Sequence, residues 1–136
     1  MKFDEINLEM AFGFSEVITA EQVKDFARLT GDNNRMHVDL SFGQGSKYGN
    51  NIVHGMLAGS LFSRLIGVYC PGEHGVYLSQ TLNFKKPIFP GDEIFVSGVV
   101  IDKSESTKII TFKTEILKNN KVAIEGVARA IIIDNE

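Results

Sequence analysis

The chain of 136 residues is poor in cysteine, in positive charge and in long apolar runs, and each shortage excludes a class of protein. Its one cysteine, Cys70, cannot form an internal disulfide, as expected in a reducing cytoplasm. The net charge of −3 argues against nucleic acid as the main partner, because phosphate-binding surfaces carry a basic excess. No apolar stretch approaches a membrane helix in length, and the acidic N-terminus does not fit a signal peptide. We therefore expect one cytoplasmic domain over residues 1–136, without a membrane partner.

The N-terminal part of the chain predicts a short strand, a helix and then a loop. Thr19 and Gln22 have the spacing of a capping box, and Gly31 is a typical helix stop, so we expect a helix between them. Residues 32–51 are rich in Asn, Gly, Asp and Ser, which predicts a long loop with one turn of helix near residues 39–44. Loops of this length are often functional.

A second helix is expected over residues 52–69. Small residues recur every four positions along it, at Gly55, Gly59, Ser63 and Gly67, and most of the other positions are apolar. A helix that is apolar nearly all round is buried, and a stripe of small residues lets another backbone approach closely. Alternatively, the glycines are merely tolerated, at about 1 kcal/mol each relative to alanine. The pattern favours a central helix with strands around it.

The second half of the chain predicts antiparallel strands, separated by turn residues that include the pair Asn119-Asn120. Four strands are expected, over residues 75–86, 92–103, 107–118 and 121–134. Helices followed by antiparallel strands indicate the α+β class.

Three residues suggest a chemistry. Asp32 and His37 lie five residues apart in the polar loop, and Gly55 opens the apolar helix with free backbone N–H groups. An acid/base pair can move protons next to a carbonyl, and a helix N-terminus can stabilise the negative charge that develops on the carbonyl oxygen. This combination is typical of an enzyme that adds water to an acyl thioester.

Two motifs carry a resemblance to a known family. The segment Gly31 to His37, GDNNRMH, is similar to the pattern Gly/Glu-Asp-x-Asn-Pro-x-His. The segment Ile52 to Leu57, IVHGML, is followed by a Ser-Leu-x-Ser sequence. The chain resembles the MaoC-like (R)-specific enoyl-CoA hydratases along nearly its whole length. The resemblance implies a hot-dog fold, in which an antiparallel sheet wraps around a central buried helix.

The resemblance also implies the roles of the site residues. Asp32 and His37 correspond to the catalytic pair, which would hydrate a trans-2-enoyl-CoA to the (R)-3-hydroxyacyl-CoA or run the reverse dehydration. The N–H of Gly55 would bind the thioester oxygen. Asn34 would brace the loop, and Ser63, expected to face inward, would support the pair.

Other positions near these motifs receive smaller roles. His54 is assigned a supporting role next to Gly55, by capping, packing or ligand contact, and Lys85 and Lys86 either bind the coenzyme A phosphates or simply face solvent. Arg35 replaces the family's proline, which would stiffen the loop. Arg35 could therefore loosen the Asp32–His37 geometry or place a charge near the site.

Simpler interpretations of these residues remain. Asp32 also fits an Asx-turn, and His37 fits a hydrogen-bonded loop histidine. Asp32, His37 and Asp39 are metal-ligand types, but their spacing is not compact, so no metal is expected. Cys70 has no paired histidine in the sequence, which argues against a nucleophile.

Rival functions remain open as well. A hot-dog thioesterase would carry a carboxylate on the central helix, but residues 54–70 contain no Asp or Glu. A non-catalytic acyl-CoA-binding module is favoured only by Arg35. The acyl group could be carried by coenzyme A or by acyl carrier protein. No cofactor is expected, since coenzyme A would be part of the substrate. A single curved sheet leaves an exposed edge, which favours pairing, and the resemblance implies a homodimer or a higher homo-oligomer.

Overall fold

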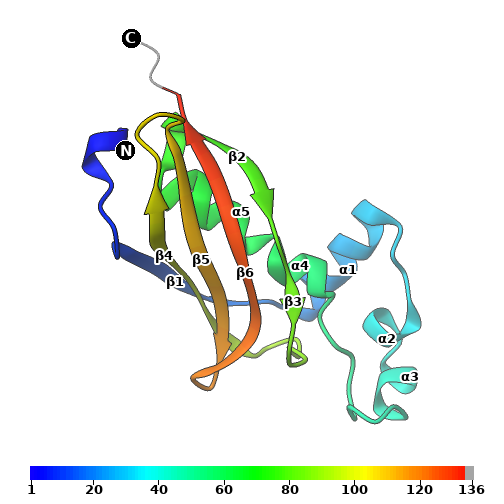
Figure 1. The fold of residues 1–136 in the computed structure, drawn as a ribbon. Helices are drawn as coiled ribbons and strands as arrows, with labels where there is room; N and C mark the ends of the chain where they lie inside the picture. Colours follow the sequence, from blue (N-terminus) through cyan, green and yellow to red (C-terminus); the bar gives the residue numbers. More distant parts are fainter. Residues whose placement is uncertain (134–136) are drawn as a thin grey trace.

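The computed structural model describes residues 1–133, in which one antiparallel sheet curves around a helical segment (Figure 1). The strands run in the order β1-β4-β5-β6-β2, and β3 pairs with β6. Their bounds are β1 Ala11–Val17, β2 Gly75–Gln80, β3 Asn83–Phe84, β4 Glu93–Lys103, β5 Ile109–Lys118 and β6 Lys121–Ile132. The expected α+β architecture, with the sheet around a central helix, is confirmed.

The helices divide into a central group and a projecting group. The bounds of the α-helices are α1 Ala20–Thr30, α2 Arg35–Val38, α3 Leu40–Gln44, α4 Gly55–Gly59 and α5 Leu61–Arg64. The helical turns are η1 Phe3–Glu5, η2 Leu65–Tyr69 and η3 Gly72–His74. The run from α4 through η2 lies in the curve of the sheet, whereas α2 and α3 project beyond it (Figure 1). No helix within residues 1–133 is long and apolar enough to span a membrane.

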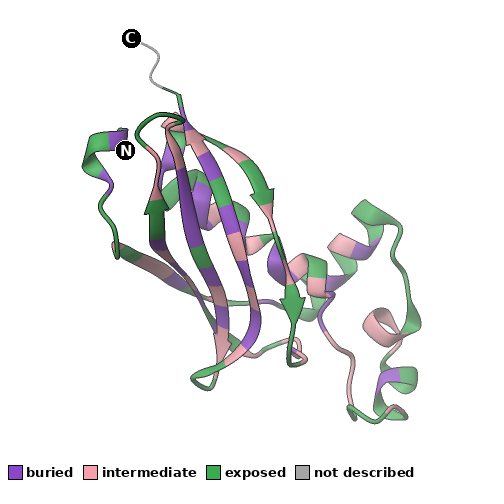
Figure 2. Cartoon of the chain, viewed as in Figure 1, coloured by how far each residue is buried: buried purple, intermediate pink, exposed green. Residues whose placement is uncertain are grey.

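The core lies between the concave face of the sheet and the central helical run (Figure 2). Alternate residues of β4 are buried, including Ile94, Val96 and Val100, as expected for a strand with one face on the core. Phe62 and Leu65 pack in the same cluster as Ile94 and Val96. Val23 of α1 and Val53 belong to the same cluster, so burial in this core positions both ends of the loop that carries the polar motif.

The predicted boundaries of α1 are confirmed. Thr19 caps the helix, because its Oγ1 accepts a hydrogen bond from the Gln22 amide at 3.1 Å. The Gln22 side chain accepts from the Thr19 amide at 2.9 Å, which completes the capping box. Gly31 ends the helix with φ of 81°, a left-handed conformation that favours glycine. Asp32 therefore begins the loop at a defined point.

Several boundaries differ from the prediction. The loop over 32–51 contains α2 as well as the expected turn over 39–44, since Asn34 and Asp39 each cap a short helix. The second helix begins at Gly55 instead of residue 52, and it ends in a π-helical turn in which the Cys70 amide donates to the Leu65 carbonyl.

The expected strand over 75–86 is divided into β2 and β3. Between them, the Val127 amide of β6 donates a hydrogen bond of 2.8 Å to the Thr81 hydroxyl, and not to a main-chain carbonyl as in a regular strand pair. The strand expected over 107–118 begins at Ile109, and β6 ends at Ile132, while residue 134 lies outside the described residues.

The stripe of small residues on the central run has a packing role only at its start. A Cβ added to Gly55 would lie 2.6 Å from the Phe84 ring, and one added to Gly59 would lie 3.1 Å from the Leu82 side chain. The close approach therefore involves side chains, not the expected backbone. Ser63 and Gly67 are exposed, so the prediction of a helix buried all round is wrong for the single chain.

Candidate active site

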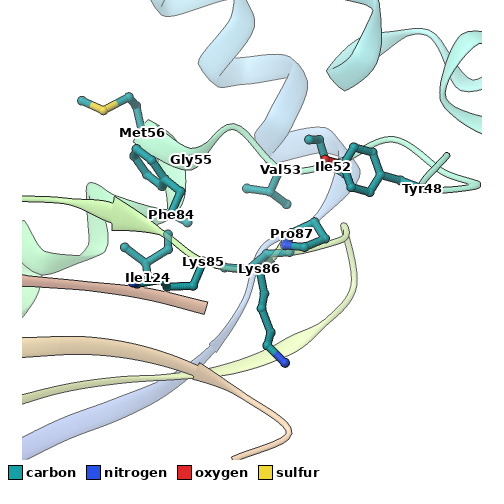
Figure 3. Close-up of a pocket in the computed structure, with 12 residues that line it drawn as sticks. Tyr48, Ile52, Val53, Gly55, Met56, Phe84, Lys85, Lys86, Pro87 and Ile124 are labelled. Atoms are coloured by element: carbon teal, nitrogen blue, oxygen red, sulfur yellow. The ribbon is translucent and has the colours of Figure 1, made fainter. Parts of the chain in front are cut away.

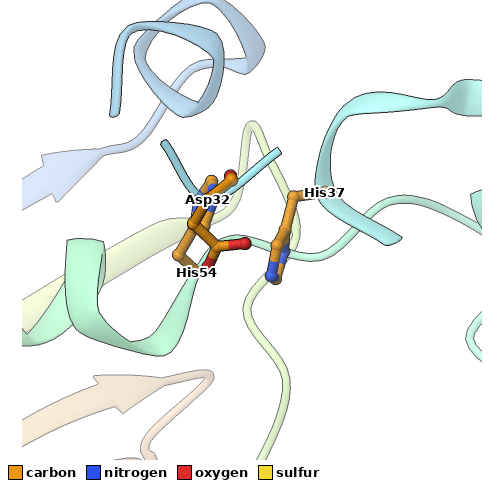
Figure 4. A group of neighbouring side chains, drawn as sticks. All are labelled: Asp32, His37 and His54. Atoms are coloured by element: carbon orange, nitrogen blue, oxygen red, sulfur yellow. The ribbon is translucent and has the colours of Figure 1, made fainter. Parts of the chain in front are cut away.

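Asp32, His37 and His54 form a group of neighbouring side chains (Figure 4). One carboxylate oxygen and one ring nitrogen from each histidine lie within 4.8 Å of one another. Asp32 follows α1, His37 lies in α2, and His54 immediately precedes α4. Three separate elements thus bring together an acid/base pair and a second histidine.

The His37 ring is held by a main-chain carbonyl. Its Nδ1 lies 2.7 Å from the Ile52 carbonyl oxygen. Because a carbonyl only accepts, Nδ1 carries the proton, and the neutral ring keeps its lone pair on Nε2. His37 is half-buried, so it can hold a fixed orientation and still accept a proton from a bound molecule.

Asp32 is exposed, and its carboxylate is only partly used by the local structure. Its Oδ1 accepts a hydrogen bond from the Asn34 amide at 3.3 Å, which is an Asx-turn. Asn34 in turn caps α2, since its Oδ1 accepts from the Met36 amide at 2.9 Å. A carboxylate has about four lone-pair positions, so the turn leaves acceptors for a water molecule.

His54 is the residue of this group that sequence reasoning weighted too lightly. It is only 2% exposed, and its Nε2 lies 3.0 Å from the Asp32 carbonyl oxygen. Its ring lies against Phe26, with 4.8 Å between centroids, and stacks on His37, with 3.9 Å between centroids. A histidine that follows an apolar residue in sequence gives no sign of such contacts.

The polar atoms of the group are close enough to share one water molecule. Two hydrogen bonds of ordinary length, about 2.8 Å each, place the partners of one water roughly 4.5 Å apart. The Asp32 oxygen and the His37 nitrogen lie within 4.8 Å of each other. The pair can therefore bind one water between them and exchange protons with it.

A metal site is less well matched to this geometry. The group contains His54 in place of Asp39, whose carboxylate instead caps α3 and pairs with Arg35. The two histidine rings are nearly parallel, at 26°, so their in-plane lone pairs lie side by side. Metal ligands need lone pairs that converge on one point.

Arg35 does not point its charge at the pair. Its Nε lies 3.3 Å from the Asp39 carboxylate, and its guanidinium lies over the Phe42 ring at 4.8 Å. The Phe42 amide and then the Arg35 guanidinium hold the pKa of Asp39 below its ordinary value. Arg35 thus joins α2 to α3, which is a stiffening role of the kind expected from the family's proline.

Asn51 braces the loop and was not predicted. Its Nδ2 donates to the Asp39 carbonyl at 2.8 Å and to the Met36 carbonyl at 3.0 Å. The Ile52 amide also donates to the Met36 carbonyl, at 3.3 Å. These partners lie 12 to 15 residues away in sequence, so no local pattern could have identified the contact.

A cavity of about 350 Å³ opens beside Gly55 (Figure 3). Gly55, Tyr48, Met56 and Phe84 are among the residues that line it, together with Lys85 and Lys86. Its size is within the range of small-molecule sites. Lys85 forms an ion pair with Glu125 at 3.4 Å, whereas Lys86 extends away from Gly55.

Ser63 does not join the group in the single chain. It lies on α5 and is exposed, so the expectation that it faces inward is wrong for one isolated chain.

Comparisons with known proteins agree with this architecture. The family profile described as "MaoC like domain" matches residues 5–122. The chain is 40% identical over 110 residues to an (R)-specific enoyl-CoA hydratase of Aeromonas caviae, which covers 80% of this chain and 82% of that protein. It is 35% identical over 122 residues to a mitochondrial 3-hydroxyacyl-[acyl-carrier-protein] dehydratase of Arabidopsis thaliana, covering 87% and 72% of the two chains.

Solved structures show the same fold. The (R)-hydratase from A. caviae involved in PHA biosynthesis superposes with a TM-score of 0.91 at 35% identity, over 93% of this chain and 97% of that one. The unliganded R-hydratase PhaJ1 from Pseudomonas aeruginosa superposes with a TM-score of 0.93 at 27% identity, over 98% and 86%. The sheet around a central helix is the hot-dog fold, and this chain belongs to the MaoC-like domain family.

Proposed function

We propose that this protein hydrates trans-2-enoyl-CoA to (R)-3-hydroxyacyl-CoA and catalyses the reverse dehydration. The proposal rests chiefly on one observation: a carboxylate oxygen of Asp32 and a ring nitrogen of His37 lie within 4.8 Å of each other, close enough for one shared water. The relatives named as (R)-specific enoyl-CoA hydratases support the reaction and its configuration. The chain acts as a single domain over residues 1–136.

We assign both proton transfers of the proposed reaction to the pair and its water. The water held by Asp32 and His37 loses one proton to the pair as its oxygen bonds to C3 of the enoyl group. The pair delivers one proton to C2, so it returns to its starting protonation state. His37 can accept through Nε2, because its Nδ1 proton is donated to Ile52. Coenzyme A enters only as part of the substrate.

Gly55 is proposed to stabilise the charge on the thioester oxygen. As the first residue of α4, its N–H has no acceptor within the helix. The cavity beside it gives a thioester a place to approach this N–H. A donor aimed at a developing oxyanion typically contributes about 10²-fold or more to the rate.

The carrier of the acyl group is proposed to be coenzyme A, with Lys86 the stronger candidate for its phosphates. The ion pair with Glu125 already neutralises Lys85, whereas Lys86 forms no ion pair within residues 1–133. The Arabidopsis relative is named for an acyl-carrier-protein substrate, so carrier-protein thioesters form the second candidate. Comparing Lys86→Ala on both substrates tests this, with a rise in KM expected for coenzyme A thioesters alone.

We also propose that the chain functions as a homodimer. β2 is an edge strand, and Val76 and Leu78 on it are 45% and 50% exposed. Val68, close by on η2, is 70% exposed. Exposed apolar residues along an unpaired edge favour pairing with a second sheet. The acyl chain would then lie near the subunit boundary. Light scattering that found a stable monomer at micromolar concentration would contradict this arrangement.

The rival functions have less support. A thioesterase would use a carboxylate on the central helical run, and none occurs over residues 54–70. The binding module was favoured by Arg35, whose guanidinium instead contacts Asp39 and Phe42. Release of free thiol from an acyl-CoA would support the thioesterase, and enoyl-CoA binding without turnover would support the module.

The decisive experiment follows the loss of enoyl-thioester absorbance with crotonyl-CoA. We expect rapid loss with the wild type, and a rate lower by at least about 10²-fold with Asp32→Asn. An (R)-specific dehydrogenase then identifies the product's configuration. Asp102→Asn is a matched control, because Asp102 is exposed at the end of β4. A folded Asp32→Asn variant with wild-type turnover would rule out the mechanism.

A further inference from the structure

We propose that His54 is a positioning residue for the catalytic pair, holding the Asp32 backbone by a donated hydrogen bond and the His37 ring by stacking. This inference rests on the function proposed above. His54 does not need to touch the substrate for this role. It acts through Asp32 and His37, which contact the substrate.

The first part of the argument is the tether to Asp32. The His54 Nε2 lies 3.0 Å from the Asp32 carbonyl oxygen, 22 residues away in sequence. Because that oxygen can only accept, the neutral His54 ring must carry its proton on Nε2. Asp32 is exposed and His54 is buried, so the bond ties a solvent-facing loop to a residue anchored next to the central helix.

The second part is the stack on His37. The His54 ring contacts the rings of both Phe26 and His37, at centroid distances of 4.8 and 3.9 Å. The bond to the Ile52 carbonyl alone would leave the His37 ring free to rotate about it. Contact with the His54 ring fixes the ring plane as well, and with it the direction of the Nε2 lone pair.

The third part is an unpaired atom. The Nδ1 of His54 is buried, and it has no hydrogen-bond partner within residues 1–133. A buried unpaired acceptor costs free energy that a phenylalanine or leucine of similar size would not incur. If His54 served only to fill space, an apolar residue would be more stable there. The Nε2–H bond to Asp32 is the contact that only a nitrogen donor provides.

Tautomers give a test that needs no turnover. In long-range ¹H–¹⁵N spectra, at a pH where both rings are neutral, we expect His37 protonated on Nδ1 and His54 on Nε2. Two stacked rings would thus show opposite tautomers. A wild-type spectrum with His54 protonated on Nδ1 would overturn the proposal, because Nε2 could then not donate to Asp32.

Matched substitutions separate positioning from packing. His54→Phe keeps an aromatic ring but cannot donate, and we expect kcat to fall at least about tenfold with KM within about threefold of wild type. His54→Gln places an amide nitrogen the same number of bonds from Cα as Nε2 but removes the ring that stacks on His37, so it should recover only part of the kcat lost in His54→Phe. His74→Phe, at a half-buried histidine in η3 that pairs with Glu73 and lies outside the group of Asp32, His37 and His54, should leave kcat unchanged.

The outcomes distinguish the hypotheses. Wild-type kcat in folded His54→Phe would overturn the proposal, and so would equal losses of kcat and melting temperature in the Phe and Gln variants. If His54→Phe does not fold, the wild-type tautomers and the kcat of His54→Gln still test the positioning role. A wild type that hydrates no enoyl thioester would instead defeat the proposed function, while the spectra would still report on the two rings.

Discussion

The sheet core and the segment over residues 31–54 are held together by different forces (Figure 2). In the core, side chains such as Phe112, Ile116 and Val96 are completely buried. In the segment 31–54, the buried residues are Gly43, Val53 and His54. Hydrogen bonds to main-chain carbonyls order this segment, whereas apolar burial stabilises the sheet.

This contrast suggests that stability and activity depend on separate sets of residues. The core positions the two ends of the segment, because Gly31 ends α1 and the Val53 amide donates to the Ile88 carbonyl at 2.8 Å. Between these ends, polar contacts determine where Asp32 and His37 lie. Substitutions in the core should therefore change the free energy of unfolding, and substitutions in the segment should change turnover.

The largest expected effect is in the core. Phe112→Ala should lower the free energy of unfolding by about 3–5 kcal/mol, because it removes a completely buried aromatic ring and leaves a cavity. Turnover per folded molecule should stay close to wild type. Urea unfolding measures the free energy of unfolding, and steady-state kinetics measure the turnover. The control is Phe95→Ala, since Phe95 is 43% exposed and should cost much less. Equal losses in the two variants would contradict the burial argument.

The next effect is in the segment. Asn51→Asp keeps the shape of the side chain but cannot donate to the Met36 and Asp39 carbonyls. We expect a loss of about 1 kcal/mol in the free energy of unfolding, and a fall in turnover of about tenfold as α2 and His37 loosen. Steady-state kinetics and urea unfolding on the same preparation check both numbers. Unchanged turnover would show that the segment is ordered without this brace.

A smaller effect is expected where the chain departs from its family. Arg35 is the first residue of α2, a position that tolerates proline. Arg35→Pro should leave turnover within about threefold of wild type, since rigidity that proline restores, about 0.4–1 kcal/mol, offsets the lost surface pair with Asp39. Steady-state kinetics measure the turnover of Arg35→Pro, and thermal melts measure its stability. A large gain in turnover would mean that Arg35 impairs the pair.

The smallest effect concerns Cys70, in the core. Burial raises the pKa of its thiol from 9.0 to about 11, so at pH 8 the folded protein should react slowly with a thiol reagent. The unfolded thiol ionises first as pH rises, so this group's contribution to stability is complete below pH 9 and is lost between 9 and about 11. Thiol labelling with and without urea tests this. Fast labelling of the folded chain would indicate local opening at η2.

Local patterns predicted much of the fold. The capping box at Thr19 and the stop at Gly31 are contacts within one turn, so neighbouring residues suffice to specify them. The Asn119-Asn120 pair, with φ of 52° and 60°, makes the expected hairpin between β5 and β6. The sequence analysis missed α2, although its Asn34 cap is a local contact, and it did not anticipate the division of the central helix.

The sequence by itself determined the fold class, the family and the presence of Asp32, His37 and Gly55, because capping, alternation and motif spacing are local properties of the chain. Only the tertiary structure decided that His54 contacts both members of the pair, that Asn51 braces α2, and that Arg35 points away. Those contacts join residues that are distant in sequence or depend on side-chain direction. Folding of the core brings them together, and no local pattern records the result.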